Sequence, residues 1–173
     1  MTNRILFFIF LSISIFSIIG CGYKPTTYYA KDEIKGKVFV DTPIDIFNTK
    51  NSILLRDAVN ELLISKFNVT LVNNKSRADM LVSAKLNSVT HKGLETSIDG
   101  YTITYRAIVS INFSYKTNSV NSFHKKVTLS NYYDYSVDED SSISDKNKLD
   151  AVKIATKKAL SNIFSKIAIN SMK

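Results

Sequence analysis

Histidines and carboxylates are the side chains in this sequence that could take part in catalysis or hold a metal ion. His91 and His124 have no cysteine, acid or second histidine at the spacing of zinc ligands, so no metal site is predicted. Asp138, Glu139 and Asp140 are consecutive in a serine-rich stretch, which is more typical of a solvated turn than of paired catalytic carboxylates. Nucleophile elbows, phosphate loops and dinucleotide fingerprints are missing. We therefore expect a binding or structural protein, without enzymatic activity or a cofactor.

The single cysteine, Cys21, follows a segment typical of secretion signals. Residues 1–20 carry Arg4 near their start and then an apolar run interrupted only by serines. This run is shorter than a typical membrane span. The tetrapeptide Ile18-Ile19-Gly20-Cys21 resembles the bacterial lipobox, in which the cysteine sulfur is lipidated and the signal is cut just before it. The alternative is an uncleaved membrane anchor with an incidental cysteine.

Lipidation would make Cys21 a membrane anchor rather than a redox or catalytic thiol. Two or more acyl chains, such as palmitate, give stable anchoring where one gives only marginal binding. Gly22 follows the cysteine, and the lack of aspartate there favours the outer membrane, by resemblance to bacterial lipoproteins. On the periplasmic side the net charge of +8 is expected to meet anionic lipid or a partner protein, and not nucleic acid.

Residues 101–116 form the element that should position the other side chains. Every odd position from Tyr101 to Tyr115 is apolar or aromatic, and all but one even position is polar. This period of two predicts a long strand with one buried face and one face in water. Because a slip of one residue would expose the whole apolar set, the register should be firmly fixed. We expect helices to cover the odd face.

Three further strands are predicted. Residues 37–40 indicate a first strand at a sheet edge, residues 79–91 a second, and residues 123–137 the last, with a bulge at Asn131 where the apolar face is interrupted. Residues 68–72 could add a short extended piece.

Two amphipathic helices follow from apolar positions spaced three and four apart. They cover residues 52–67 and the segment from residue 144 or 145 to Met172. Helices with one apolar stripe must cover a sheet with one apolar face. The sequence therefore predicts an α+β fold: a two-layer α/β sandwich with a four-stranded, mostly antiparallel sheet and two helices on one face, in the order β-α-β-β-β-α. Residues 37–173 would form this single domain, after a signal peptide over residues 1–20 and a lipidated tether over residues 21–36.

Residues 92–100 and 138–147 are predicted loops, and in an antiparallel meander they lie at the same end of the sheet. Lys92, Arg106, Lys146 and Lys148 could gather there, together with several acids. Tyrosines near this end either pack in the core or form a partner interface, where tyrosine is enriched. Tyr133 is the one that we include among the candidate contacts.

The order of these features resembles the LptE family of lipopolysaccharide-assembly lipoproteins from Gram-negative outer membranes. The features that carry the resemblance are a helix after the first strand, a final amphipathic helix, and the sequences Gly20-Cys21-Gly22-Tyr23, Arg77-Ala78-Asp79, Asp99-Gly100 with Tyr105, and Tyr132-Tyr133-Asp134.

The resemblance implies a two-layer sandwich that plugs the lumen of a large β-barrel, LptD. Such a protein supports the assembly of the barrel and the passage of lipopolysaccharide to the outer leaflet, and can itself bind lipopolysaccharide. The contacts implied here are Lys92, Arg106, Lys146, Lys148 and Tyr133. Ile98 stands before Asp99-Gly100, where the family pattern favours a basic residue. The alternatives are a lipoprotein activator of a peptidoglycan synthase and a hydrolase with a site made of scattered residues.

Overall fold

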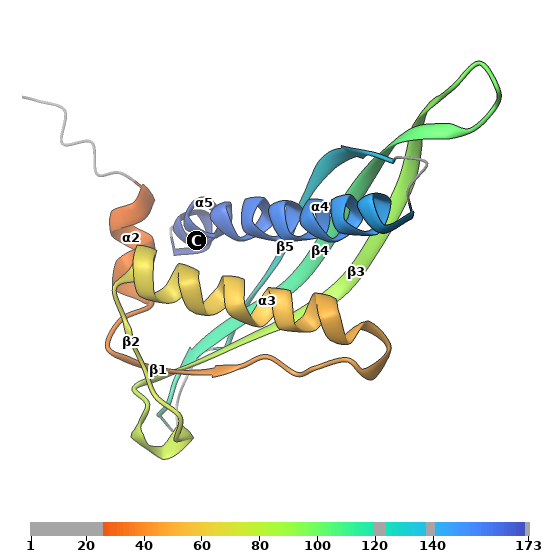
Figure 1. Ribbon diagram of the computed structural model, residues 1–173. Helices are drawn as coiled ribbons and strands as arrows, with labels where there is room; N and C mark the ends of the chain where they lie inside the picture. Colours follow the sequence, from red (N-terminus) through yellow and green to blue (C-terminus); the bar gives the residue numbers. More distant parts are fainter. Residues whose placement is uncertain (1–25, 120–123, 138–140, 172–173) are drawn as a thin grey trace, which may run out of the picture.

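The computed structural model describes residues 26–119, 124–137 and 141–171 (Figure 1). The predicted signal segment, Cys21 and the acids Asp138 to Asp140 lie outside the described residues. The main elements are α2 (Thr26–Glu33), β1 (Lys37–Asp41), η1 (Ile46–Asn48), α3 (Thr49–Leu62), η2 (Leu63–Phe67), β2 (Thr70–Leu71), η3 (Lys75–Arg77), β3 (Met80–Thr96), β4 (Thr102–Thr117), β5 (Lys125–Ser136), α4 (Ser141–Ser161) and α5 (Ile163–Ser171).

The sheet has five strands in the order β2-β1-β3-β4-β5. Strands β3, β4 and β5 form the predicted antiparallel meander, whereas β1 runs parallel to both β2 and β3. The predicted α+β class is confirmed, but the four-stranded sheet is wrong in detail. The extended piece that begins at Thr70 pairs with β1, so β1 lies inside the sheet and not at its edge.

The helices α3, α4 and α5 lie on one side of the sheet (Figure 1). They cover the odd face of β4, where Ala107, Val109, Ile111, Phe113 and Tyr115 are all buried. The prediction for this strand is confirmed over these positions. Nearer the start of β4 the odd side chains lose their cover, and Tyr101 and Ile103 are exposed.

The second helix prediction needs one correction. A single helix to Met172 is wrong, because the helix breaks at Asn162 and continues as α5. The first helix is found, but it begins earlier, at Thr49, and ends in the π-helical turn η2. Asn68 follows with a φ of 57°, the left-handed conformation that commonly ends helices.

Strand β3 is longer than predicted, and its side chains change face part-way. Residues 92–100 are not a loop: the strand continues to Thr96, and only a tight turn separates it from β4. A register shift lies between Leu86 and Ser88. Before it, Ala84 pairs with Phe113 on the covered face; after it, His91 pairs with Ala107 on that face. The bulge predicted at Asn131 is absent, because β5 pairs with β4 without any shift.

Part of the segment predicted as a tether is a helix. In α2, Ala30 is fully buried, and Ile34 just after the helix is fully buried too. The helix packs against α5 and connects to β1 through Gly36, whose φ is +79°. A Cβ atom on Gly36 would lie 2.6 Å from Asp79 Oδ2, and this oxygen accepts the backbone N–H of Lys37 at 2.8 Å. Glycine therefore fits this junction for two separate reasons.

Gly36→Ala tests this junction against a matched control. Gly100 in the β3–β4 turn also has a positive φ, +86°, but an added Cβ there meets no atom within 4 Å. Left-handed backbone costs an alanine roughly 1–2 kcal/mol at either site. We expect Gly36→Ala to lower the free energy of unfolding, measured in urea, by more than Gly100→Ala does. Equal losses would contradict the role of the Asp79 contact.

Candidate functional site

The side chains predicted as contacts lie on opposite faces of the sheet. Lys92 pairs with Arg106 across β3 and β4, on the face that no described helix covers. Tyr133 pairs with Ala107 and so lies on the covered face, where Lys158 Nζ sits 4.8 Å from the centre of its ring. Lys146 and Lys148 belong to the start of α4. The predicted contacts therefore form two groups, separated by the sheet.

Arg106 is held in an ion pair on the open face. Its Nε donates to Asp134 Oδ1 at 2.7 Å and its Nη2 to Asp134 Oδ2 at 2.9 Å. The guanidinium carbon also lies 4.0 Å from the centre of the Tyr132 ring. The hydrogen bonds from Arg106 lower the pKa of Asp134, which stays ionised. Lys92, by contrast, is exposed and has no ion pair within the described residues.

The open face is mainly polar, although Ile108 lies on it opposite the exposed Tyr132. Asn112 donates through Nδ2 to Asn87 Oδ1 at 3.3 Å, and its own Oδ1 accepts the Thr128 hydroxyl at 3.2 Å. Asn87 in turn donates to Ser110 Oγ at 3.4 Å. These bonds link β3, β4 and β5 across the surface of the sheet. They leave a flat hydroxyl- and amide-rich wall on the side opposite the helices.

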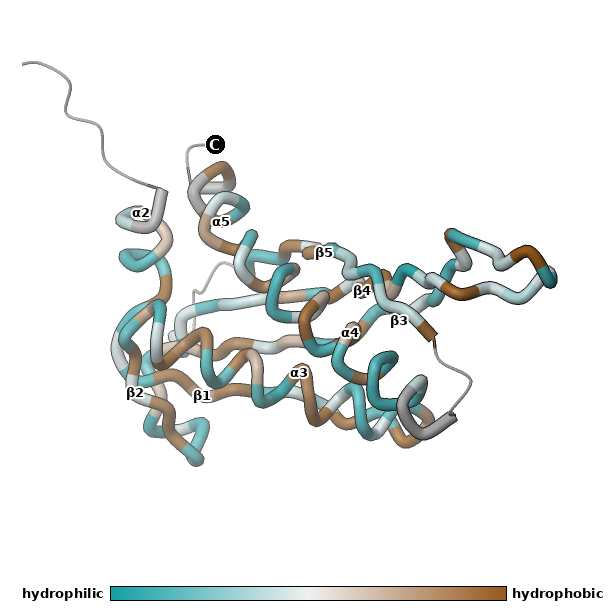
Figure 2. Tube along the Cα trace, turned by 45° about the horizontal axis from the view of Figure 1, so that its top comes forward, coloured by the Kyte–Doolittle hydropathy of each residue, from teal (hydrophilic) through white to brown (hydrophobic). Residues whose placement is uncertain are grey.

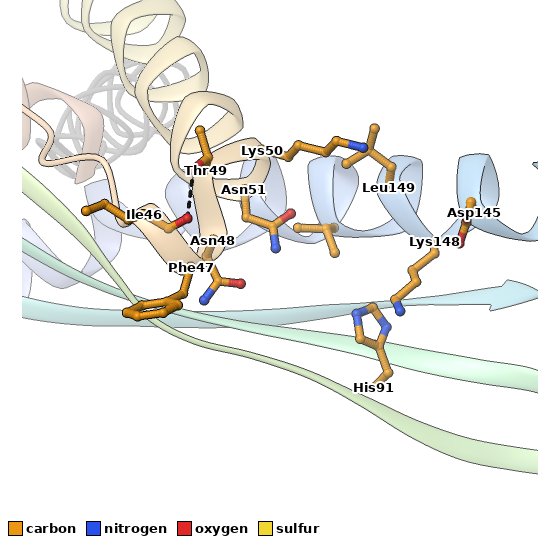
Figure 3. A pocket seen from close by; sticks show the side chains of 11 residues that line it. Ile46, Phe47, Asn48, Thr49, Lys50, Asn51, His91, Asp145, Lys148 and Leu149 are labelled. Carbon is orange, nitrogen blue, oxygen red and sulfur yellow. Dashed lines mark hydrogen bonds between the residues drawn. The ribbon is translucent and has the colours of Figure 1, made fainter.

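A cavity of about 500 Å³ lies on the other side, between the start of α3, the start of α4 and β3 (Figure 3). Lys50 and Lys148 contribute the cationic groups of its lining, and Asp145 contributes a carboxylate. Ile46 and Phe47 form an apolar rim, and Phe47 is 95% exposed. A cavity with cations and apolar side chains can accept a ligand that is both anionic and apolar.

His91 lines this cavity from β3 and forms a hydrogen bond with Tyr135. The Tyr135 hydroxyl lies 2.9 Å from His91 Nδ1, and the two rings meet edge to face. Tyr105 stacks on Tyr135 with ring centres 5.9 Å apart. Burial lowers the pKa of His91, and the positive charge of Lys148 lowers it further. His91 is thus a partly buried, neutral side chain.

More exposed apolar side chains gather at this end of the sheet. Figure 2 shows apolar positions along the projecting β3–β4 hairpin. The exposed large apolar residues of the hairpin are Leu94, Ile98, Tyr101 and Ile103. Sequence reasoning missed this group, the cavity rim and Lys50. The alternation from residue 101 pointed to buried side chains, and the residues before α3 show no period at all.

Within the described residues there is no metal-binding cluster, and no helix is long and apolar enough to cross a membrane.

A family model described as LptE, lipopolysaccharide-assembly, matches residues 41–167. The chain belongs to the LptE family. The match takes in the sheet from the end of β1 onwards, both faces described above, and α3 and α4. The resemblance drawn from the sequence is thereby confirmed.

Solved structures share the LptE-like fold. Rare lipoprotein B from Shewanella oneidensis matches with a TM-score of 0.50 and 15% identity, covering 80% of this chain and 97% of that one. A candidate lipoprotein from Caulobacter crescentus matches with a TM-score of 0.54 and 10% identity, covering 83% and 93%. At these identities the likeness concerns the fold alone. A search of curated protein sequences found no match.

The lowered pKa of His91 predicts a pH-dependent stability. The unfolded chain takes up a proton near the ordinary pKa of about 6.5, whereas the folded state resists it to lower pH. The stabilisation should be complete above that pH and decline as the pH falls below it. We expect His91→Gln to reduce the difference in the free energy of unfolding between pH 7.5 and pH 5.

His124→Gln, which removes an exposed histidine in the same way, provides the matched control. If His91→Gln kept the wild-type pH dependence in full, the assignment to His91 would be wrong.

Proposed function

We propose that this chain is a lipid-anchored outer-membrane subunit of the lipopolysaccharide translocon, with no catalytic activity of its own. It plugs an LptD-like β-barrel, supports the assembly of that barrel and assists the insertion of lipopolysaccharide into the outer leaflet. Family membership supports the assignment to lipopolysaccharide assembly. The observation that carries the finer proposal is the uncovered polar face of the sheet.

The interior of a large membrane β-barrel is polar, because only its outer surface meets lipid. The open face offers the matching chemistry, with the amides and hydroxyls of Asn87, Asn112 and Thr128 already bonded to one another. Such a wall can lie against a polar lumen without leaving buried donors or acceptors unpaired. The helices on the other face of the sheet would fill the rest of the lumen.

Lipopolysaccharide combines phosphate groups with acyl chains, and the cavity beside α3 and α4 offers a partner for each. Lys50 and Lys148 line the cavity as point charges suited to phosphate. The exposed Ile46 and Phe47 suit an acyl chain. Lys146 is an exposed cation two residues before Lys148, and Lys92 is an exposed cation on the open face. Both remain candidate contacts. Arg106 is a weaker candidate, because Asp134 already occupies its guanidinium.

The anchor completes the proposal. Cleavage after residues 1–20 and lipidation of Cys21 would hold the domain, which begins with α2, at the inner leaflet of the outer membrane, on its periplasmic side. The chain from Cys21 to the first described helix, α2, is short. A short connection favours a partner in the same membrane over one deep in the periplasm.

The barrel interface can be tested by copurification from outer membranes in mild detergent. Thr128→Trp places a large ring on the exposed open face, and we expect it to reduce recovery of a large β-barrel protein at least several-fold. Asp57→Trp, an exposed position on α3, should leave recovery unchanged. Cys21→Ala should still recover the barrel from detergent, because the lipid positions the chain and does not form the interface. Recovery of a peptidoglycan synthase without any barrel would contradict the proposal.

Lipopolysaccharide binding can be tested at the cavity. Lys148→Glu reverses one charge that lines it, and the loss of a charged contact should weaken binding about tenfold. Lys66→Glu makes the same change at an exposed lysine beyond the far end of α3. The two variants have the same net charge, so a general electrostatic effect would weaken both equally. Surface plasmon resonance on purified protein is the measurement, and equal weakening would contradict a specific cavity site.

A further inference from the structure

The short helix α2 is locked to the body of the domain. Ala30 and Ile34 are fully buried, and the helix packs against α5. Glu33 reaches across to β5, where Lys125 Nζ donates to both of its carboxylate oxygens, at 2.7 and 2.8 Å. This ion pair is only about a third exposed or less on either side. The first described helix cannot swing freely relative to the sheet.

The residues just after the end of α2 are also fixed, by hydrogen bonds from their backbone N–H groups. The backbone N–H of Lys35 donates to Met80 Sδ at 3.4 Å, and that of Lys37 donates to Asp79 Oδ2 at 2.8 Å. Met80 is the first residue of β3, and Asp79 directly precedes it. The helix is therefore fixed by side chains on one flank and by backbone bonds where it joins β1.

The chain between the proposed anchor and α2 is too short to let the domain move far from the membrane surface. Residues 21–25 can span at most about 18 Å even when fully extended. A flexible tether over the whole of residues 21–36 would reach about three times as far. The end of the domain that carries α2 must therefore stay close to the leaflet that holds the lipid.

The side chains exposed at this end suit a lipid surface. The start of α2 and the end of α5 lie near each other in Figures 1 and 2. Lys31 on α2 and Lys166 on α5 are exposed cations, and Tyr28 and Ile169 are exposed on the same two helices. The exposed Asp32 is paired with Lys35 at 2.8 Å, so its charge is balanced by a further lysine. Cationic side chains attract anionic lipid, and aromatic and aliphatic ones enter the interface.

We propose that the α2–α5 end is a membrane-docking surface for anionic phospholipid, which fixes the orientation of the anchored domain. The ion pair of Glu33 with Lys125 transmits this orientation to the sheet. The β3–β4 hairpin lies at the opposite end of the sheet, so it points away from the leaflet (Figure 1). The inference rests on the lipidation of Cys21, which belongs to the proposed function above.

The test uses the full lipidated chain in vesicles of phosphatidylethanolamine and phosphatidylglycerol that contain nitroxide-labelled lipid. Single cysteines introduced as Lys31→Cys or Ile169→Cys carry a bimane label near the proposed surface. Ile46→Cys and Ile98→Cys carry it at the far end. We expect several-fold stronger quenching of the first two labels. Equal quenching at both ends, or stronger quenching at residue 98, would overturn the orientation.

A double variant tests the ion pair between Glu33 and Lys125 separately. Glu33→Gln combined with Lys125→Gln removes both charges together and leaves no unpaired ion behind. The difference in quenching between the two ends should shrink, and an undiminished difference would show that this ion pair does not set the orientation. Mass spectrometry of the N-terminal peptide is read first. A missing lipid would overturn the anchor and the orientation together, whereas equal quenching of a lipidated chain would overturn the orientation alone.

Discussion

Strand β4 and its strict alternation are the constraint on which the rest of this structure depends. The strand pairs with β3 on one side and with β5 on the other, so both neighbours take their register from it. Its odd side chains from Ala107 to Tyr115 are buried beneath the helices. A slip of one residue would move all of them to water and bring Arg106, Ser110 and Asn112 into the core. Each buried aliphatic side chain is worth about 1.5–3 kcal/mol, so no slipped register can compete.

The same constraint creates the open face. Because the odd apolar set lies on the helix side, the even positions of β4, which are all polar except Ile108, face water or a polar partner. Their neighbours on β3 and β5 complete hydrogen bonds across the face, from Asn87 to Asn112 to Thr128. A face satisfied in this way gains little from another copy of itself and has little apolar area to hide. It suits a large polar wall, which is the reasoning behind the barrel proposal.

Much of this fold could be predicted because its elements carry a single clear period. The alternating pattern predicted the extent of β4 and its buried face from Ala107 to Tyr115, but not the exposure of Tyr101 and Ile103. β3 was harder, since its apolar positions are even from Met80 to Leu86 whereas Val89 is odd, and the bulge between Leu86 and Ser88 keeps them on one face.

Other features could not be read from the chain because they depend on contacts distant in sequence. Helix α2 is short and weakly amphipathic, and it is held by packing against α5 and by the ion pair with Lys125 on β5, both distant in sequence. The cavity joins the start of α3, His91 and Lys148, which no local period connects. Lys148 was predicted from the end of the sheet at which its loop should lie. His91 and Lys50 were not, because the bulge in β3 and the fold-back before α3 decide where they point.

The two ends of the sheet therefore have different chemistry for a physical reason. At the end near α2, most apolar positions are buried between α2 and α5, and the exposed remainder combines lysines with Tyr28 and Ile169. At the hairpin end the strands outrun the helices, so apolar residues of β3 and β4 have nothing to cover them. Ile98, Tyr101 and Phe47 stay in water and so forgo the stabilisation that burial would give. Exposed apolar side chains gathered at one end of a molecule are typical of a surface that a ligand or partner covers.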